Sequence, residues 1–220
     1  MVDFALLRKN MVESQVRTSD VTDRRLLRAM AEVPREAFVP EALRPLAYSG
    51  EALALAPGLL ARALPAPMTM GKLIQLANIE PTDKVLEIGC ATGYGTALMA
   101  RLAASVTALD SDPALTAAAK ANIAGLGLTN DDIETGPLEA GWPAGAPYDL
   151  IVVSGAVPEL SPAWREQLRD GGRLVAVIAD GPIARAMLFE KTGKEWGRRF
   201  GFDTVAPALP GFARKPAFAL

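Results

Sequence analysis

The 220-residue sequence contains no histidine and a single cysteine, Cys90. Without histidine the chain cannot build a His-based catalytic triad, an imidazole proton shuttle or an imidazole metal site, and nothing else in the sequence indicates a metal. One cysteine cannot form an internal disulfide. The N-terminus, MVDFALLRKN, also lacks the basic-then-apolar order of a secretion signal, so we expect a reducing, cytoplasmic compartment.

Strong charge and long apolar runs are missing as well. The chain has 25 acidic and 23 basic residues, a formal net charge of -2 and no Lys/Arg-rich block. We therefore expect neither a nucleic acid nor a membrane as a partner. No apolar run reaches the roughly 18 residues of a membrane span without a proline or a charge. Half of the residues are hydrophobic, which predicts one compact unit with a sizeable core but leaves the oligomeric state open.

The first 80 residues differ in pattern from the rest. Apolar residues recur at near-helical spacing over 4–16, and Thr22 can cap a second helix through Met30. Residues 52–70 are apolar, with three prolines and one charge, Arg62, and a short helix is expected from about Gly71 to Asn78. We interpret 1–80 as an N-terminal helical extension that covers the substrate side. Arg62 could clamp a carboxylate there, but an exposed loop arginine is the interpretation we favour.

From residue 81 onward short β-rich runs alternate with helical stretches. The runs are KVLEI, SVTAL, IET, YDLIVV and RLVAVI, and the gaps between them are long enough for crossover helices. This alternation predicts an α/β core over 81–220, with a mostly parallel sheet covered by helices. Residues 185–200 contain two strand-like arms around Thr192-Gly193-Lys194, which predicts a closing antiparallel hairpin.

The loop after the first of these strands carries the strongest functional pattern, VLEIGCATGYG at 85–95. Small residues there allow a ligand to approach the backbone, and the following helix offers free N–H groups. A dinucleotide site requires G-x-G-x-x-G, whereas this loop has E-x-G-x-A-x-G with Glu87 before the first glycine. An acid at that position would repel a pyrophosphate but suits the sulfonium and amine end of S-adenosylmethionine.

Further polar residues are expected beside this loop. Asp110 ends the next strand, where a carboxylate can accept hydrogen bonds from both ribose hydroxyls of a nucleoside. Ser154 ends YDLIVVS and could either face a ligand or simply cap the strand. The candidate cofactor-binding residues are Glu87, Gly89, Cys90, Ala91, Gly93, Asp110, Ser111 and Ser154. Cys90 has no basic neighbour in sequence, so we interpret it as a small buried side chain rather than a reactive thiol.

With these motifs in place, the chain resembles the protein-L-isoaspartate (D-aspartate) O-methyltransferase family from about residue 10 to residue 178. The blocks, in family order, are MVESQVRTSDVTDRRLLRAMAEVPREAFVPEALRPLAY, PTDKVLEIGCATGYGTALMARLA, GWPAGAPYDLIVVSGAVPE and LRDGGRLVAVI. The resemblance implies a Rossmann-like, seven-stranded methyltransferase fold and S-adenosyl-L-methionine as the cofactor. It also implies methyl transfer to a carboxylate of an isomerised aspartyl residue in a protein or peptide. The ester then cyclises to a succinimide that reopens in part as normal aspartate, which is protein repair.

The chain departs from the family pattern at the substrate side. The family's G-x-T-I-S-Q-P, whose hydroxyls lie at the substrate carboxylate, aligns with ARALPAP at 61–67. Pro67 matches the final proline, but Ala63 replaces the threonine, Pro65 the serine and Ala66 the glutamine. The resemblance therefore leaves the catalytic residue unassigned.

Two further departures lie on the cofactor side. The acid of the family's G-D-G, expected to hold the adenine amine, is replaced by Pro137. Loss of such a charge-assisted hydrogen bond costs about 1.5–3 kcal/mol, or roughly ten- to a hundred-fold in affinity. Ala91 stands at the middle glycine of the loop, where a methyl group disfavours positive φ.

We expect a methyltransferase of the isoaspartyl-repair type whose repair activity is weakened or lost. Two alternatives remain open: a methyltransferase with a changed substrate, and a protein that keeps the fold but has a binding or regulatory role. Glu87 and Asp110 favour cofactor binding, whereas Pro65 and Pro137 argue against the ancestral reaction.

Overall fold

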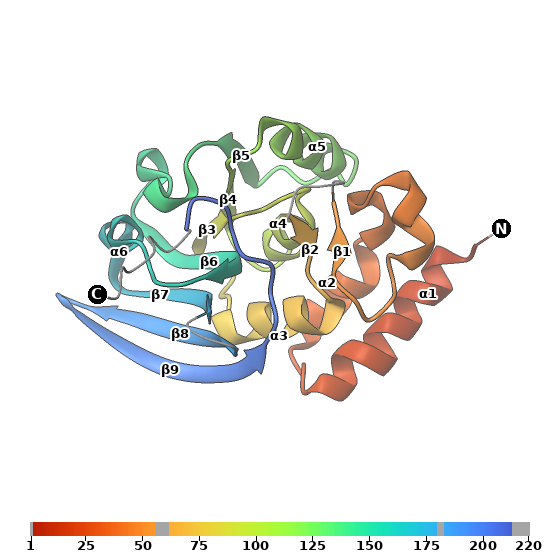
Figure 1. Ribbon diagram of the computed structural model, residues 1–220, viewed down its shortest axis with the longest axis horizontal. Helices are drawn as coiled ribbons and strands as arrows, with labels where there is room; N and C mark the ends of the chain where they lie inside the picture. Colours follow the sequence, from red (N-terminus) through yellow and green to blue (C-terminus); the bar gives the residue numbers. More distant parts are fainter. Residues whose placement is uncertain (1, 56–61, 180–182, 213–220) are drawn as a thin grey trace, which may run out of the picture.

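A seven-stranded sheet forms the centre of the computed structural model, which describes residues 2–55, 62–179 and 183–212 (Figure 1). In spatial order the strands are β5 (Asp131–Thr135), β4 (Ser105–Asp110), β3 (Lys84–Ile88), β6 (Tyr148–Val157), β7 (Leu168–Ala179), β8 (Ala184–Thr192) and β9 (Glu195–Thr204). The first five run parallel, and β8 and β9 pair antiparallel. The prediction of a mostly parallel sheet with a C-terminal antiparallel hairpin is confirmed.

The inner strands are apolar because both faces of the sheet are covered. Side chains alternate between the two faces along each strand. On β3, Val85 packs into the larger hydrophobic core, while Leu86 and Ile88 pack into a second core on the other face. On β6, Val152 likewise packs into the larger core and Ile151 into the second core. This double burial explains why the sequence shows short continuous apolar runs here.

The crossover helices lie on opposite faces of the sheet on either side of β3. Helices α4 (Tyr94–Ala100) and α5 (Pro113–Ala124) connect β3 to β4 and β4 to β5, and both pack into the larger core. Helix α6 (Pro162–Gln167) connects β6 to β7 and contributes Trp164 to the second core. The order in which successive strands are added to the sheet therefore reverses between β3 and β6, and ligands bind at the carboxyl ends of strands beside such a switch point.

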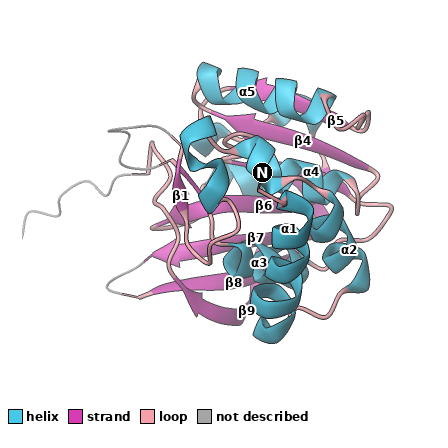
Figure 2. Ribbon diagram, turned by 90° about the vertical axis from the view of Figure 1, so that its right-hand side faces the viewer, coloured by secondary structure: helices cyan, strands magenta, loops and turns pink. Residues whose placement is uncertain are grey.

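The N-terminal residues pack on the same face as α4 and α5. Helix α1 (Phe4–Met11) continues into a π-helical turn at Val12–Val16, followed by a 3₁₀ turn and helix α2 (Arg24–Glu32). The cap of α2 is not Thr22 as predicted but Asp23, whose carboxylate accepts hydrogen bonds from the first-turn N–H groups. Figure 2 shows α1, α2 and α3 together in front of the sheet, with α5 beside β4 and β5.

Helix α3 spans Pro67–Ala77 and so begins four residues before the predicted start. Pro67 occupies the first turn, where its missing N–H needs no partner, and Asn78 ends the helix in the left-handed conformation. The segment before it contains a short pair of strands, β1 (Leu53–Ala54) and β2 (Ala63–Leu64). Residues 56–61 of the expected cover, and residues 213–220 at the end of the chain, lie outside the described residues.

Among the helices of the described residues, none has the length and apolar character needed to cross a lipid bilayer.

Replacing Ile151 with alanine should destabilise the fold far more than the same change at Ile183. Ile151 is fully buried on β6, whereas Ile183 is 53% exposed. We expect Ile151→Ala to lower the free energy of unfolding by about 2–5 kcal/mol and Ile183→Ala by less than about 0.5 kcal/mol. Urea denaturation of both variants measures the difference. Equal losses would contradict the assignment of Ile151 to the core.

Candidate functional site

The glycine loop follows β3 at the carboxyl edge of the sheet, beside the ends of β4 and β6. The loop turns sharply because three of its residues take positive φ: Gly89 (83°), Ala91 (52°) and Gly93 (91°). The N–H groups of Gly89 and Cys90 both bond to the carbonyl of Leu109 on β4, at 2.8 and 3.1 Å. All residues from 89 to 95 are buried. The predicted loop residues are therefore brought together at the expected edge of the sheet.

Ala91 adopts the conformation that a glycine would take without strain. The left-handed region costs a non-glycine residue roughly 1–2 kcal/mol, and such strain persists where surrounding contacts hold it. One of these contacts is a 2.8 Å hydrogen bond from the Ala91 N–H to Oδ2 of Asp110. The Ala91 N–H thus bonds to Asp110 while the residue keeps a left-handed conformation.

Glu87 lies fully buried near the end of β3 and is held by two hydroxyl groups. Ser154 on β6 and Thr96 on α4 each donate a hydrogen bond of 2.6 Å, one to each carboxylate oxygen. Burial raises the pKa of Glu87 from 4.5 to about 6, against the opposing effect of these two hydrogen bonds. Ser154 lies within β6 rather than at its end, and its hydroxyl is bonded to Glu87.

Asp110 is the second buried acid and ends β4. Its Oδ2 accepts the Ala91 N–H, and its Oδ1 accepts the Asp112 N–H at 3.2 Å. Arg62 donates from Nη2 to the same Oδ2 and forms a buried ion pair with it. The carboxylate therefore has two partners in the backbone and one charged side chain.

Arg62 is not the exposed loop residue that we expected, because only 5% of it is accessible to solvent. It directly precedes β2 and lies against the end of β4, 48 residues away in the sequence. A lone charge in an apolar segment must either reach water or find an opposite charge. The position of Arg62 among apolar residues in the sequence was compatible with exposure to water and with a buried ion pair. In the fold, Asp110 provides the opposite charge.

Residues 207–209, which follow β9, pack against β6 and the glycine loop. Ala156 on β6 donates its N–H to the Pro207 carbonyl at 2.8 Å, and Leu209 donates to the Ala156 carbonyl at 2.9 Å. The Leu209 side chain then lies so close to Gly89 and Gly155 that a Cβ on either would approach it to 2.8 and 2.5 Å. Only glycine fits at both positions while Leu209 is there.

The remaining predicted residues are placed less centrally. Ser111 is exposed beyond Asp110, outside this cluster of acids. Cys90 is buried in the loop, and burial followed by the charge of Glu87 raises the pKa of its thiol well above the ordinary range. Pro65 is buried, and its carbonyl accepts a 2.6 Å hydrogen bond from Arg35. Pro137 follows β5 at the same edge of the sheet and is exposed.

The residue types in this cluster are those that a binding site for S-adenosylmethionine needs. A glycine loop, a strand-end carboxylate at Asp110 and a second acid at Glu87 supply the close backbone approach and the acceptors that such a nucleoside needs. In the conformation described here Arg62 holds Asp110 and Leu209 covers Gly89. Pro137 supplies no acid for the adenine amine.

Two residues of this site were missed by sequence reasoning. Thr96 is a polar residue in the otherwise apolar helix α4, and that contrast was a usable signal. Leu209 gave none, because its position depends on how the chain returns after β9.

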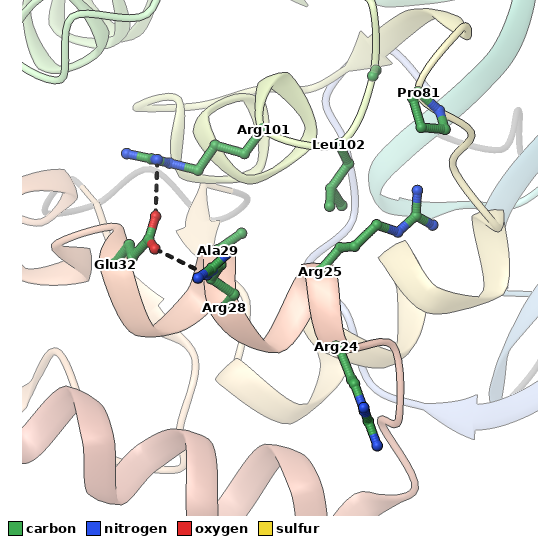
Figure 3. Close-up of a pocket in the computed structure, with 9 residues that line it drawn as sticks. Arg24, Arg25, Arg28, Ala29, Glu32, Pro81, Arg101 and Leu102 are labelled. Atoms are coloured by element: carbon green, nitrogen blue, oxygen red, sulfur yellow. Dashed lines mark hydrogen bonds and ion pairs between the residues drawn. The ribbon is translucent and has the colours of Figure 1, made fainter.

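A separate hollow of about 670 Å³ lies between α2 and the end of α4, away from the glycine loop (Figure 3). Arg24, Arg25 and Arg28 on α2 and Arg101 after α4 line it. Glu32 bonds to Arg101 at 3.1 Å and to Arg28 at 3.6 Å. None of the predicted site residues contributes to this hollow.

Comparison with known proteins identifies similar chains. The family model described as protein-L-isoaspartate(D-aspartate) O-methyltransferase matches residues 7–198. The protein-L-isoaspartate O-methyltransferase of Herpetosiphon aurantiacus is 36% identical over 189 residues, which cover 86% of this chain and 83% of that protein. The enzyme of the same name from Methylorubrum extorquens is 36% identical over 211 residues, which cover 95% and 91%.

Solved structures are similar as well. A protein-L-isoaspartate O-methyltransferase superposes with a TM-score of 0.81 at 26% identity, over 93% of this chain and 66% of that one. A putative protein-L-isoaspartate O-methyltransferase from Plasmodium falciparum, solved in complex with S-adenosyl-L-homocysteine, superposes with a TM-score of 0.76 over 95% and 99%. At 18% identity this second likeness shows the fold alone.

Stability should fall with rising pH because of Glu87. The native state keeps the Glu87 proton up to about pH 6, whereas the unfolded chain loses it near 4.5. Between these values the native state binds more protons, so raising the pH removes about 2 kcal/mol of stability relative to a variant that cannot titrate. Urea unfolding of the wild type and Glu87→Gln from pH 4 to 7 measures this difference. A difference that is constant with pH would contradict the raised pKa.

The thiol of Cys90 should be unreactive in the native protein. It is 4% exposed and its raised pKa leaves little thiolate at neutral pH. We expect Ellman's reagent to modify it only after denaturation. Rapid, stoichiometric reaction at pH 7.5 without denaturant would show that the loop opens readily.

Proposed function

Since the chain belongs to the protein-L-isoaspartate (D-aspartate) O-methyltransferase family, we propose that it transfers a methyl group from S-adenosyl-L-methionine to a carboxylate of isomerised aspartyl residues in proteins or peptides. The observation that carries this proposal is the buried carboxylate of Asp110 at the end of β4, 2.8 Å from the glycine-loop N–H of Ala91. An acceptor there suits a ribose, and the loop beside it suits a ligand in close contact with the backbone.

The cofactor, when bound, supplies an electrophilic methyl group on a sulfonium sulfur. Asp110 would accept hydrogen bonds from the ribose hydroxyls, and Glu87 would place a negative charge near the cationic end of the ligand. The glycine loop lets the backbone approach. Residues 89–95 are buried, and exclusion of water beside them would favour methyl transfer.

The substrate carboxylate is already a nucleophile, so the reaction needs no general base. Positioning and desolvation contribute most of the rate acceleration. A histidine-free chain can therefore perform this chemistry. The methylated product is released, and attack of its backbone amide nitrogen on the ester carbonyl expels methanol and forms a succinimide, which water reopens in part as normal aspartate.

We further propose that repair is less efficient in this protein than the family pattern predicts. Ala63 and Pro65 supply no hydroxyl to the substrate carboxylate, and the Pro65 carbonyl is already bonded to Arg35. A non-catalytic or regulatory role is the alternative. It is favoured by the contacts of Arg62 with Asp110 and of Leu209 with Gly89, which cover the loop.

Calorimetric titration with S-adenosylhomocysteine and methyl transfer to an isoaspartyl peptide test the proposal together. We expect saturable binding by the wild type and measurable methylation of the isoaspartyl peptide but not of its normal aspartyl counterpart. Asp110→Asn should weaken binding by roughly ten- to a hundred-fold, because it removes charge-assisted hydrogen bonds to the ribose. Binding of S-adenosylhomocysteine without any methyl transfer would favour the regulatory alternative over the enzyme. Absence of binding would overturn the proposal.

A further inference from the structure

Arg62 has more hydrogen-bonding capacity than its surroundings use. Its side chain is 95% buried, and within 2–55, 62–179 and 183–212 only Nη2 has a partner, the Asp110 carboxylate. Nε and Nη1 are buried without a hydrogen-bond partner among the described residues. Buried N–H groups of a charged side chain are costly to leave unsatisfied. Nε and Nη1 each share an edge of the guanidinium with Nη2, so an arginine released from Asp110 can bind a carboxylate with two parallel hydrogen bonds through Nη2 and one of these donors.

The Asp110 carboxylate cannot fully accept hydrogen bonds from Arg62 and from the hydroxyls of a ribose at the same time. Its other two partners, the N–H groups of Ala91 and Asp112, belong to the backbone of the site. Arg62 is the only side chain of the three, so it is the partner that can leave without changing the loop. Once it leaves, a buried guanidinium needs either water or another anion.

The charges of the site indicate which anion this is. Glu87 and Asp110 are both acidic and buried, so a substrate carboxylate that enters beside them meets like charge. Arg35, the other buried arginine, is bound to the carbonyls of Ala47 and Pro65 and lies 5.0 Å from the ring centre of Tyr94. Among the described residues Arg35 leaves one donor without a partner, Nη1, whereas Arg62, which directly precedes the hydroxyl-free stretch 63–67, leaves two.

Building on the proposed function, we propose that Arg62 binds the substrate carboxylate and that Asp110 is its partner only until the cofactor's ribose displaces it. The guanidinium takes over the positioning role of the missing hydroxyls. Cofactor and substrate binding are thereby coupled: the cofactor binds first, and Arg62 is then released toward the substrate.

The test compares Arg62→Ala and Arg62→Lys with the wild type and with Arg28→Ala. Arg28 is a matched control because its side chain is 82% exposed on α2 and lies outside the site. We expect Arg62→Ala to bind S-adenosylhomocysteine at least several-fold more tightly, because no ion pair has to be broken. The same variant should raise KM for an isoaspartyl peptide roughly ten- to a hundred-fold, with a smaller change in kcat. Arg62→Lys should restore part of the KM, and Arg28→Ala should change neither quantity.

The outcomes separate this inference from the function on which it rests. If the wild type binds S-adenosylhomocysteine and methylates the peptide but Arg62→Ala and Arg62→Lys match it in both affinity and KM, the role of Arg62 is wrong and the function stands. If neither the wild type nor the variants bind or methylate, the proposed function fails and the inference fails with it. Circular dichroism of each variant establishes folding, and Arg62→Lys, which keeps the charge, decides the case should Arg62→Ala not fold.

Discussion

The carboxylate of Asp110 is the point on which the described arrangement of the site depends. It joins three parts of the chain: the end of β4 that carries it, the glycine loop through the Ala91 N–H, and the segment before β2 through Arg62. A fully buried carboxylate is stable only when its charge is compensated and its lone pairs are satisfied. These contacts meet both needs, and they hold Ala91 in a left-handed conformation that an isolated alanine avoids.

The two buried acids of the site are stabilised in different ways. Asp110 has a guanidinium and two backbone N–H groups, whereas Glu87 has only the hydroxyls of Ser154 and Thr96. Hydroxyl groups offset less of the desolvation cost than an opposite charge does, so burial raises the pKa of Glu87. One glycine loop is therefore flanked by two carboxylates with different electrostatic surroundings.

Segments distant in the sequence close this site from two sides. Arg62 comes from before β2 and contacts the strand-end acid Asp110, and Leu209 comes from after β9 and contacts Gly89 of the glycine loop. The loop is consequently buried within the protein's own core. The packing of Leu209 against Gly89 and Gly155 also gives these glycines a structural reason that is independent of any ligand.

Local sequence pattern was enough to predict the sheet, the glycine loop and the two strand-end acids. Parallel strands buried on both faces require apolar runs such as KVLEI, and the carboxyl ends of neighbouring strands must meet at one edge, so local pattern was sufficient. Helix starts were predicted less well, because Asp23 rather than Thr22 caps α2 and Pro67 begins α3. The burial of Arg62 against Asp110 and the contact of Leu209 with Gly89 follow from tertiary packing and not from local pattern. Both contacts join residues far apart in the sequence, and a lone arginine or leucine carries no local signal of the partner that the fold brings to it.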